Sequence, residues 1–273
     1  MTQTYETIET RMDGRVAVLS LNRPQVLNAI NRKLMGEVST AMAGFVADPQ
    51  ILAIVLHGHG RAFSAGFDMK ESAQRTVTSI EQWRDVLGAD FDFLIQFWDC
   101  PKPTIAAAHG FALAGGFEMA LSCDITVAAE GTRFGEPEPR FGSGIIALLL
   151  PWMTTPKIAK EMLLTGSDQI DAQRALAIGI VNHVVPLGSE LAKAMQIAND
   201  IAAAAPSSVQ LTKRAINRSY EFAGMRQALL AGVDTDVLIE SAGGPERAEF
   251  NRLRREKGLK AALAWRDAKF SRG

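Results

Sequence analysis

The chain has 273 residues, a formal net charge of −1 at pH 7 and 47% hydrophobic residues. These ordinary values leave room for one large domain or for a core with an appendage. Nothing in the charge favours nucleic acid or an anionic membrane as a partner. No window approaches the roughly 18 apolar residues of a transmembrane helix, and the acidic start does not resemble a secretory signal. We therefore expect a cytoplasmic protein with no membrane partner.

Cysteine and histidine are sparse. Cys100 and Cys123 form no Cys-x-x-Cys pattern, so we expect reduced thiols, as is usual in the cytoplasm. The histidines include no His-Glu-x-x-His pair, and we expect no metal site. His57 and His109 each close an apolar run. Packing or turn hydrogen bonds explain this placement better than catalysis.

The first elements combine a hairpin with a helix. Residues 5–22 alternate around Asp13 and Gly14, which predicts a β-hairpin. Residues 22–48 then carry apolar side chains at helical spacing. The predicted apolar stripe consists of Leu34, Val38, Met42 and Phe45.

Strands and helices then alternate. Residues 51–58 and 104–110 are short apolar runs typical of buried strands, and residues 124–131 predict another strand. Between them, residues 79–100 predict a helix that ends before two prolines, and a second helix starts near residue 115. Strand and helix recur twice in similar form. This recurrence predicts an α/β fold of stacked ββα units rather than a single open sheet.

From Pro151 onward the pattern becomes mostly helical, and Pro206 marks a boundary. We therefore divide the chain into a core of residues 1–205 and a C-terminal helical region of residues 206–273. Such a region packs either on a partner subunit or on its own core. The sequence leaves both possibilities open.

Two short segments resemble each other. Residues 64–69, SAGFDM, form what we call the first turn, and residues 114–119, AGGFEM, form the second turn. Each follows an apolar run that closes in His-Gly. Either a supersecondary unit has been duplicated for packing, or two backbone turns face one another.

The second turn has the features of an anion-stabilising site. Gly115 and Gly116 precede an apolar helix, whose first N–H groups have no intrahelical partner and lie at the positive end of its dipole. Glycine lets a ligand approach this backbone closely. With a second N–H from the first turn, the two could form an oxyanion hole. A tight structural connection is the alternative, and two glycines alone do not exclude it.

Three glutamates are candidate acid–base groups. Glu118 interrupts the apolar segment after the second turn, and a buried charge is costly unless it is paired or functional. Glu138 stands between two prolines that restrict its loop. Glu136 competes with it, and composition does not choose between them. A structural ion pair or a solvated loop remains the alternative for each.

Several segments in order resemble the crotonase family, the enoyl-CoA hydratase/isomerase superfamily, over nearly the whole chain. They are LNRPQVLNAI, GRAFSAGFDMK, HGFALAGGFEMALSCDI, RFGEPE, LLTGSDQIDAQRALAIGIVNHVVP and GLKAALAWRDAKF. The resemblance implies a crotonase-like spiral of stacked ββα units whose C-terminal helices, residues 206–273, mediate trimerisation. It also implies a homotrimer or a homohexamer.

The resemblance further implies roles for individual residues. The backbone N–H groups of Phe67 and Gly115 would form the oxyanion hole, and Glu118 and Glu138 would be the catalytic pair that acts on one water. The residues implied to bind the CoA part of the substrate are Arg23, Val26, Ala65, Gly66, Asp68, Met69 and Lys70. Asp68 itself reads as a residue that caps a turn. No separate cofactor is implied, because coenzyme A is part of the acyl-CoA substrate.

The implied reaction is hydration of a trans-2-enoyl-CoA to a 3-hydroxyacyl-CoA, in fatty-acid or related acyl-CoA degradation. The alternatives are an enoyl-CoA double-bond isomerase, an aryl-acrylyl-CoA hydratase-lyase and a non-enzymatic acyl-CoA-binding scaffold. Two departures from the family pattern stand out. Ala114 replaces the first of three glycines, and the segment after Glu138 lacks a Gly-Gly-Thr run. The second departure leaves the acyl group of the substrate open.

Overall fold

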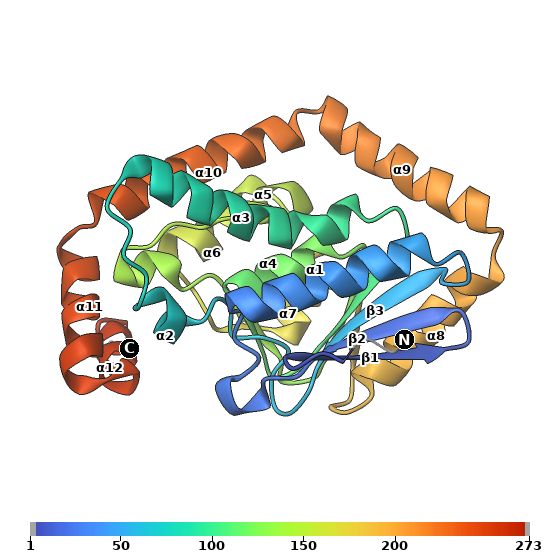
Figure 1. Cartoon of the computed structure of the whole chain (residues 1–273), viewed down its shortest axis with the longest axis horizontal. Coiled ribbons are helices and arrows are strands. Elements are labelled where there is room, and N and C mark those ends of the chain that lie inside the picture. Colours follow the sequence, from blue (N-terminus) through green and yellow to red (C-terminus); the bar gives the residue numbers. More distant parts are fainter. Residues whose placement is uncertain (1–3, 271–273) are drawn as a thin grey trace.

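The chain is built on a six-stranded sheet, and the structure, a computed structural model, describes residues 4–270 (Figure 1). In spatial order the strands are Ile8–Asp13 (β1), Val16–Leu21 (β2), Ala53–Gly58 (β3), Thr104–Ala108 (β4), Ile125–Ala129 (β6) and His183–Val185 (β9). β1 and β2 are antiparallel, which confirms the predicted hairpin, and the remaining neighbours are parallel. The strands are short and apolar because most of them are buried on both faces.

Three further strands form a second, smaller sheet. It contains Phe111–Leu113 (β5), Arg133–Gly135 (β7) and Ile170–Asp171 (β8). An isolated bridge between Ser64 and Ala112 extends its pairing toward the first turn. Successive units thus give one strand to the large sheet and one short pairing segment to the small sheet. This is the predicted stacked arrangement.

Helices pack against both sheets. In the first part of the chain they are Arg32–Ala47 (α1), Met69–Ser72 (α2), Ile80–Asp99 (α3), Gly115–Ser122 (α4), Leu150–Met153 (α5), Pro156–Thr165 (α6), Ala172–Ala177 (α7) and Glu190–Ala203 (α8), with 3₁₀ turns at Pro24–Val26 (η1) and Glu138–Phe141 (η2). Asn31 and Ser79 begin α1 and α3, because their side chains accept hydrogen bonds from N–H groups of the first turn of each helix. The predicted stripe of α1 is buried as expected.

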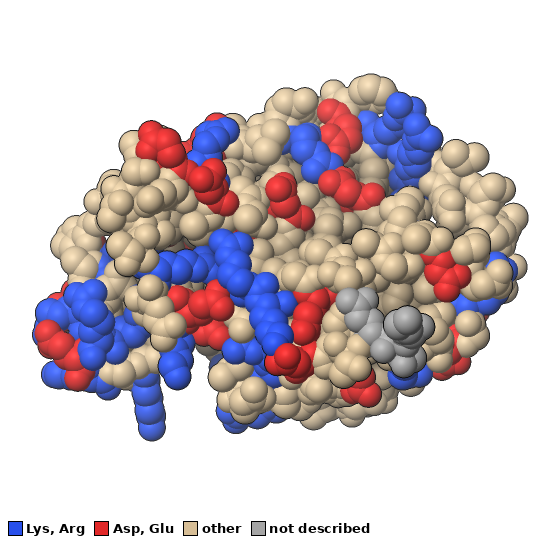
Figure 2. All heavy atoms as spheres, in the orientation of Figure 1, with Lys and Arg blue, Asp and Glu red and all other residues tan. Residues whose placement is uncertain are grey.

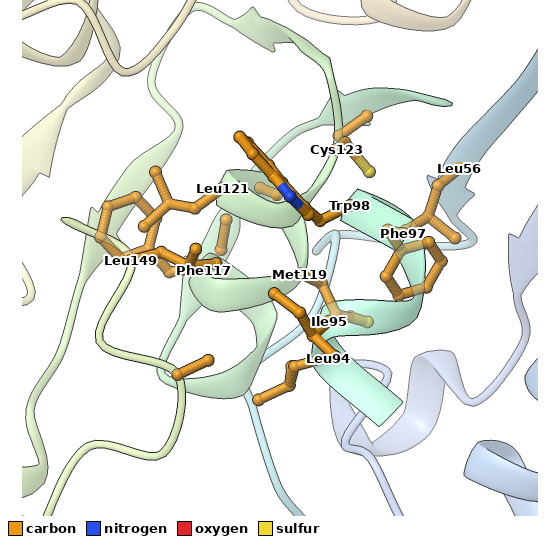
Figure 3. Close-up of a cluster of buried hydrophobic side chains, with 14 of the residues drawn as sticks. Leu56, Leu94, Ile95, Phe97, Trp98, Phe117, Met119, Leu121, Cys123 and Leu149 are labelled. Atoms are coloured by element: carbon orange, nitrogen blue, oxygen red, sulfur yellow. The ribbon is translucent and has the colours of Figure 1, made fainter. Parts of the chain in front are cut away.

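The short helix α4 runs through the centre of the core, and all of its residues are buried. Phe117 and Leu121 face Leu149 on one side, whereas Met119 faces side chains of α3 on the other (Figure 3). Cys100 and Cys123 are both buried and do not form a disulfide with each other. A polar side chain on α4 is therefore surrounded by hydrophobic packing.

The C-terminal region is helical, as predicted, and α9 begins at Pro206. Its helices are Pro206–Phe222 (α9), Met225–Ala242 (α10), Pro245–Lys257 (α11) and Leu259–Ala268 (α12). In Figure 1, α9 and α10 form an arc along one edge, α10 lies against α3, and α11 and α12 lie beside α2. Leu229 and Val237 bury one face of α10, whereas Phe222 at the end of α9 is 86% exposed. Among the described residues, no helix is long and apolar enough to span a membrane.

Candidate active site

A pocket of about 910 Å³ lies between the two turns, α3 and the C-terminal helices. It draws residues from both predicted parts of the chain, since α10, α11 and α12 all contribute to its walls. Lys and Arg side chains, with some acidic ones among them, gather around α2, α11 and α12 (Figure 2). The basic groups that line the pocket are Arg23, Arg61, Lys70, Arg75, Arg247, Arg254, Arg255 and Arg266. Such a rim suits a ligand that carries phosphates.

The first and second turns pack directly against each other. The Ser64 N–H donates to the Phe111 carbonyl at 3.0 Å, and the Leu113 N–H donates back to the Ser64 carbonyl at 3.1 Å. A Cβ on Gly116 would lie 2.4 Å from the Ser64 carbonyl oxygen, so no side chain fits there. Of the two explanations for the repeat, the structure shows two turns that face one another.

Two backbone donors are left free where the turns meet. Within residues 4–270, neither the Phe67 nor the Gly115 N–H donates a hydrogen bond to the protein. A Cβ built on Gly66 would lie 3.1 Å from the Gly115 nitrogen, so the two turns bring this donor close to Gly66 and Phe67. Phe67 and Ala114 line the pocket, whereas Gly66 and Gly115 are buried directly against them. The geometry therefore offers two neighbouring unpaired N–H groups at the pocket wall.

Glu118 projects from α4 into the pocket and is only 2% exposed. Its Oε1 accepts a hydrogen bond from the Ala147 N–H at 2.5 Å, which fixes the carboxyl group. Burial, together with the nearby Glu138 carboxylate, raises the pKa of Glu118 well above its ordinary value. The group is therefore suited to hold a proton and to exchange it with a bound ligand.

Glu138 begins the 3₁₀ turn η2 and lines the same pocket. Burial raises the pKa of Glu138 to about 7, although hydrogen bonds from its own N–H and from the Glu136 side chain act in the opposite direction. Glu136 does not line the pocket and is 2% exposed. Burial raises the pKa of Glu136, which favours its protonated form as a donor to Glu138. Of the two candidate acid–base residues in this loop, Glu138 therefore lines the pocket. Glu136 is buried outside the pocket lining and is hydrogen-bonded to Glu138.

The residues expected along CoA gather at the pocket. Those that line it are Arg23, Val26, Ala65, Asp68, Met69 and Lys70. Arg23 pairs with Asp68 at 3.0 Å. Asp68 also accepts hydrogen bonds from the Lys70 and Glu71 N–H groups at 3.0 and 3.2 Å, so it caps α2, as the sequence indicated. Its carboxylate is engaged in structure rather than free for chemistry.

The C-terminal helices close the pocket from the side of α2 and η2. Arg254 of α11 donates to the Met69 carbonyl at 2.8 Å, and Phe250 stacks on Phe141 with ring centroids 5.0 Å apart. Arg266 of α12 lines the pocket, and its charge lowers the pKa of Glu138. No local sequence pattern indicates these residues, because their contacts span more than 100 positions of the chain.

Three acidic residues of the pocket were also missed. Asp90 of α3 and Asp236 and Glu240 of α10 are all buried at its wall. A signal for the last two was present, because they fall on the same helical stripe as Leu229 and Val237. An acid on an apolar helical stripe predicts burial, as it does for Glu118.

His57 and His109 lie outside the pocket. Their rings stack at 5.1 Å, and His109 Nε2 is 3.1 Å from the Gly60 carbonyl oxygen, which agrees with the expected packing and turn roles. Glu190 lies near both, and one ligand atom from each of the three falls within 4.8 Å of the others. Burial lowers the pKa of His57 to about 4, so this imidazole is neutral at pH 7.

Known proteins resemble the chain over most of its length. Residues 11–236 match the enoyl-CoA hydratase/isomerase family. A probable enoyl-CoA hydratase of Mycobacterium tuberculosis is 38% identical over 231 residues, which cover 80% of this chain and 84% of the relative. A short-chain-enoyl-CoA hydratase of Clostridium acetobutylicum is 37% identical over 236 residues, covering 84% of each.

Solved structures agree with these sequence relatives. The crystal structure of an enoyl-CoA hydratase/isomerase from Xanthobacter autotrophicus Py2 superposes with a TM-score of 0.96 at 46% identity, covering 98% of this chain and 99% of that one. The α/β architecture of stacked ββα units is thus the crotonase-like fold that the sequence predicted. The chain belongs to the enoyl-CoA hydratase/isomerase family.

Proposed function

We propose that the protein is an enoyl-CoA hydratase, which adds water across the double bond of a trans-2-enoyl-CoA to give a 3-hydroxyacyl-CoA. One observation carries the proposal. Glu118 and Glu138 line the same pocket, beside a wall where the Phe67 and Gly115 N–H groups are free. The names of the relatives from Mycobacterium tuberculosis and Clostridium acetobutylicum support the same reaction.

In this proposal the free N–H groups bind the thioester carbonyl oxygen. As the nucleophile adds at C3, negative charge develops on that oxygen, and two fixed donors stabilise it more strongly than they stabilise the ground state. The donors need no reorganisation, because the packing of the two turns already holds them. The basic rim would bind the CoA phosphates, and no cofactor besides the substrate's own coenzyme A is required.

The two glutamates would move the protons. One ionised carboxylate accepts a proton from the attacking water, and one protonated carboxyl supplies a proton to C2. Burial raises the pKa of both groups, and the Glu138 carboxylate raises that of Glu118 further, which favours a coupled pair that shares a proton. By analogy with the enoyl-CoA hydratase/isomerase family, we assign Glu138 as the proton donor to C2 and Glu118 as the base toward water.

A turnover assay with trans-2-enoyl-CoAs of varied length tests the reaction, with products identified by mass. We expect a gain of one water per molecule. A protein that only shifts the double bond of a 3-enoyl-CoA, without adding water, would be an isomerase instead.

Solvent deuterium tests the assignment of roles to the two glutamates. Glu138→Gln should abolish deuterium incorporation at C2 of a bound acyl-CoA, whereas Glu118→Gln should retain it.

We also propose that the protein forms a homotrimer or a dimer of trimers through its C-terminal helices. Lys213 is the only residue of α9 that is buried in the described chain. The exposed apolar side chains of α9 include Leu211, Ile216 and Phe222. Phe222→Asp should therefore lower the mass measured by light scattering in solution and leave the circular dichroism spectrum unchanged. An unchanged mass for this variant would place the interface elsewhere.

A further inference from the structure

One wall of the pocket carries none of the residues expected along CoA. It is formed by α3 and α10, which lie against each other. Trp83, Val86 and Leu87 supply an apolar surface on the α3 side. Asp236 and its neighbour Glu240 supply carboxyl groups on the α10 side. The wall is therefore mixed in polarity, unlike a surface built for a plain alkyl chain.

The acids in this wall differ in their partners. Asp90 pairs with Arg32 at 3.0 Å, and Glu240 pairs with Arg247 and also accepts a hydrogen bond from Ser143. Asp236 is 2% exposed, yet within the described residues it has neither an ion pair nor a hydrogen-bond partner, and its Oδ1 is fully buried. A buried carboxyl group without a partner costs free energy, so its presence calls for an explanation.

The loop opposite Asp236 is shaped to admit its carboxyl group. A Cβ built on Gly144 would lie 1.9 Å from Asp236 Oδ1 and 2.5 Å from its Cγ, so any larger residue at position 144 would displace the acid. Burial raises the pKa of Asp236 to about 8, with further contributions from Glu240 and Glu138, while Arg247 acts in the opposite direction. At neutral pH the group is therefore mostly a neutral acid, which can both donate and accept a hydrogen bond.

We propose, building on the hydratase function above, that the acyl group of the substrate carries a hydroxyl group beyond the double bond and that Asp236 binds this hydroxyl. A hydroxyl can donate and accept, so it matches a carboxyl group in either protonation state. An ammonium group only donates and would require the ionised acid, and a carboxylate would be repelled by Glu240 and Glu138. A plain alkyl chain would leave Asp236 unpaired.

Matched substrates test the proposal. Two trans-2-enoyl-CoAs of equal carbon number, one with a terminal hydroxyl and one without, are compared by kcat/KM in the wild type, Asp236→Ala and Asp236→Asn. We expect the wild type to prefer the hydroxylated substrate by roughly tenfold or more, because a site that hydrogen-bonds a hydroxyl rejects the analogue that lacks it. Asp236→Ala should remove the preference, measured as the ratio of kcat/KM for the two substrates, and Asp236→Asn should retain part of it.

A control variant and a binding measurement distinguish failure of the proposed Asp236 contact from failure of the proposed hydratase function. Asp234→Ala removes an exposed acid of the same helix that pairs with Arg84, and it should leave the preference unchanged. Binding of saturated acyl-CoAs, with and without the hydroxyl, is measured by calorimetry independently of turnover. Equal binding of the two by the wild type, or a preference for an ammonium-bearing chain, would overturn the proposal. Preferential binding of the hydroxylated ligand without any hydration would support the Asp236 contact and refute the hydratase function.

Discussion

The first and second turns contain nearly the same residues, but the shared sequence does not mark equivalent donors. Aligning Gly-Phe-acid-Met pairs Phe67 with Phe117, whereas the free N–H groups belong to Phe67 and Gly115. The shared feature is in the backbone. Each free N–H directly follows a residue with positive φ, which is Gly66 at +87° and Ala114 at +55°. The two turns are therefore matched by conformation, with an offset of two residues.

The acidic residues of the two turns differ in their burial and in their partners. Asp68 and Glu118 each follow Gly-Phe, but Asp68 caps a short helix at the pocket mouth and pairs with Arg23. Glu118 lies in a helix that is buried on every side, where no cation of residues 4–270 pairs with it and the Ala147 N–H holds it. Burial, rather than the local sequence, turns one carboxyl group into a structural cap and the other into a candidate acid–base group.

The largest expected effect comes from exchanging each acid for its amide. Glu118→Gln should lower kcat for enoyl-CoA hydration by about 10²–10⁴, because a positioned acid or base contributes that much. Asp68→Asn should change kcat by no more than a few-fold and act mainly on KM, because Asp68 lies along the expected CoA site. Steady-state kinetics on both variants check this contrast. Comparable losses of kcat in the two variants would contradict the division of roles.

A methyl group on Gly66 should damage both turns at once. The added Cβ would lie 2.5 Å from the Ala114 Cβ and 3.1 Å from the Gly115 nitrogen, at a φ that side chains rarely adopt. We expect Gly66→Ala to lower the free energy of unfolding by about 1–3 kcal/mol and kcat by about 10²–10³, as for loss of an oxyanion donor. Gly14→Ala is the control, because its φ is +58° but nothing lies within 4 Å. This control should lose stability and keep full activity.

The pH dependence of stability should reveal the burial of Glu118 in the second turn. The folded-state pKa of Glu118 is raised above its ordinary value of 4.5, so its stabilising contribution is complete below that pH and is lost as pH rises through the folded-state pKa. Glu118→Gln lacks this loss, and it should become more stable than the wild type as pH rises above about 4.5. Asp68→Asn should be less stable than the wild type at neutral pH by up to about 1 kcal/mol, because it weakens an ion pair.

Thermal unfolding measured from pH 4 to pH 8 on the wild type and the two amide variants provides the data. A Glu118→Gln variant whose stability parallels that of the wild type at every pH would show that Glu118 is not strained by burial. The comparison needs no substrate, so it tests the electrostatics of the second turn separately from the proposed reaction.

Local signals predicted most of the fold. The hairpin around Gly14, the apolar stripe of α1 and the helix that starts at Pro206 all follow from periodicity and from turn or capping residues, which act over a few positions. The placement of Glu118 also followed from local pattern, because a charge within an apolar helix predicts burial. Such features are encoded close to where they appear.

The missed features depend on how distant elements dock. Asp236 reaches the pocket only because α10 packs on α3, far earlier in the chain, and no local pattern specifies that partner. Which of Glu136 and Glu138 reaches the pocket depends on the backbone at the 3₁₀ turn η2, which begins at Glu138. Glu138 lines the pocket, whereas Glu136 does not. The strained φ of Ala114 was likewise missed, since alanine gives no sign of it in the sequence.

Ala114 supplies the smallest effect and a direct test of the conformational match. As a non-glycine residue at φ +55° and ψ −135°, it carries strain of about 1–3 kcal/mol. Ala114→Gly would relieve that strain, but it would lose a buried methyl that contacts Gly66 and would add freedom to the unfolded chain, together about 1–2 kcal/mol.

The net change in the free energy of unfolding should therefore lie between a loss of about 1 kcal/mol and a gain of about 2 kcal/mol, measured by urea denaturation. Since the Gly115 N–H keeps its place after a residue with positive φ, kcat should remain within a few-fold of the wild type. A large loss of activity would mean that the Ala114 methyl, pressed against Gly66, holds the two donors together. In that case side-chain packing, as well as backbone conformation, would set the spacing of the two turns.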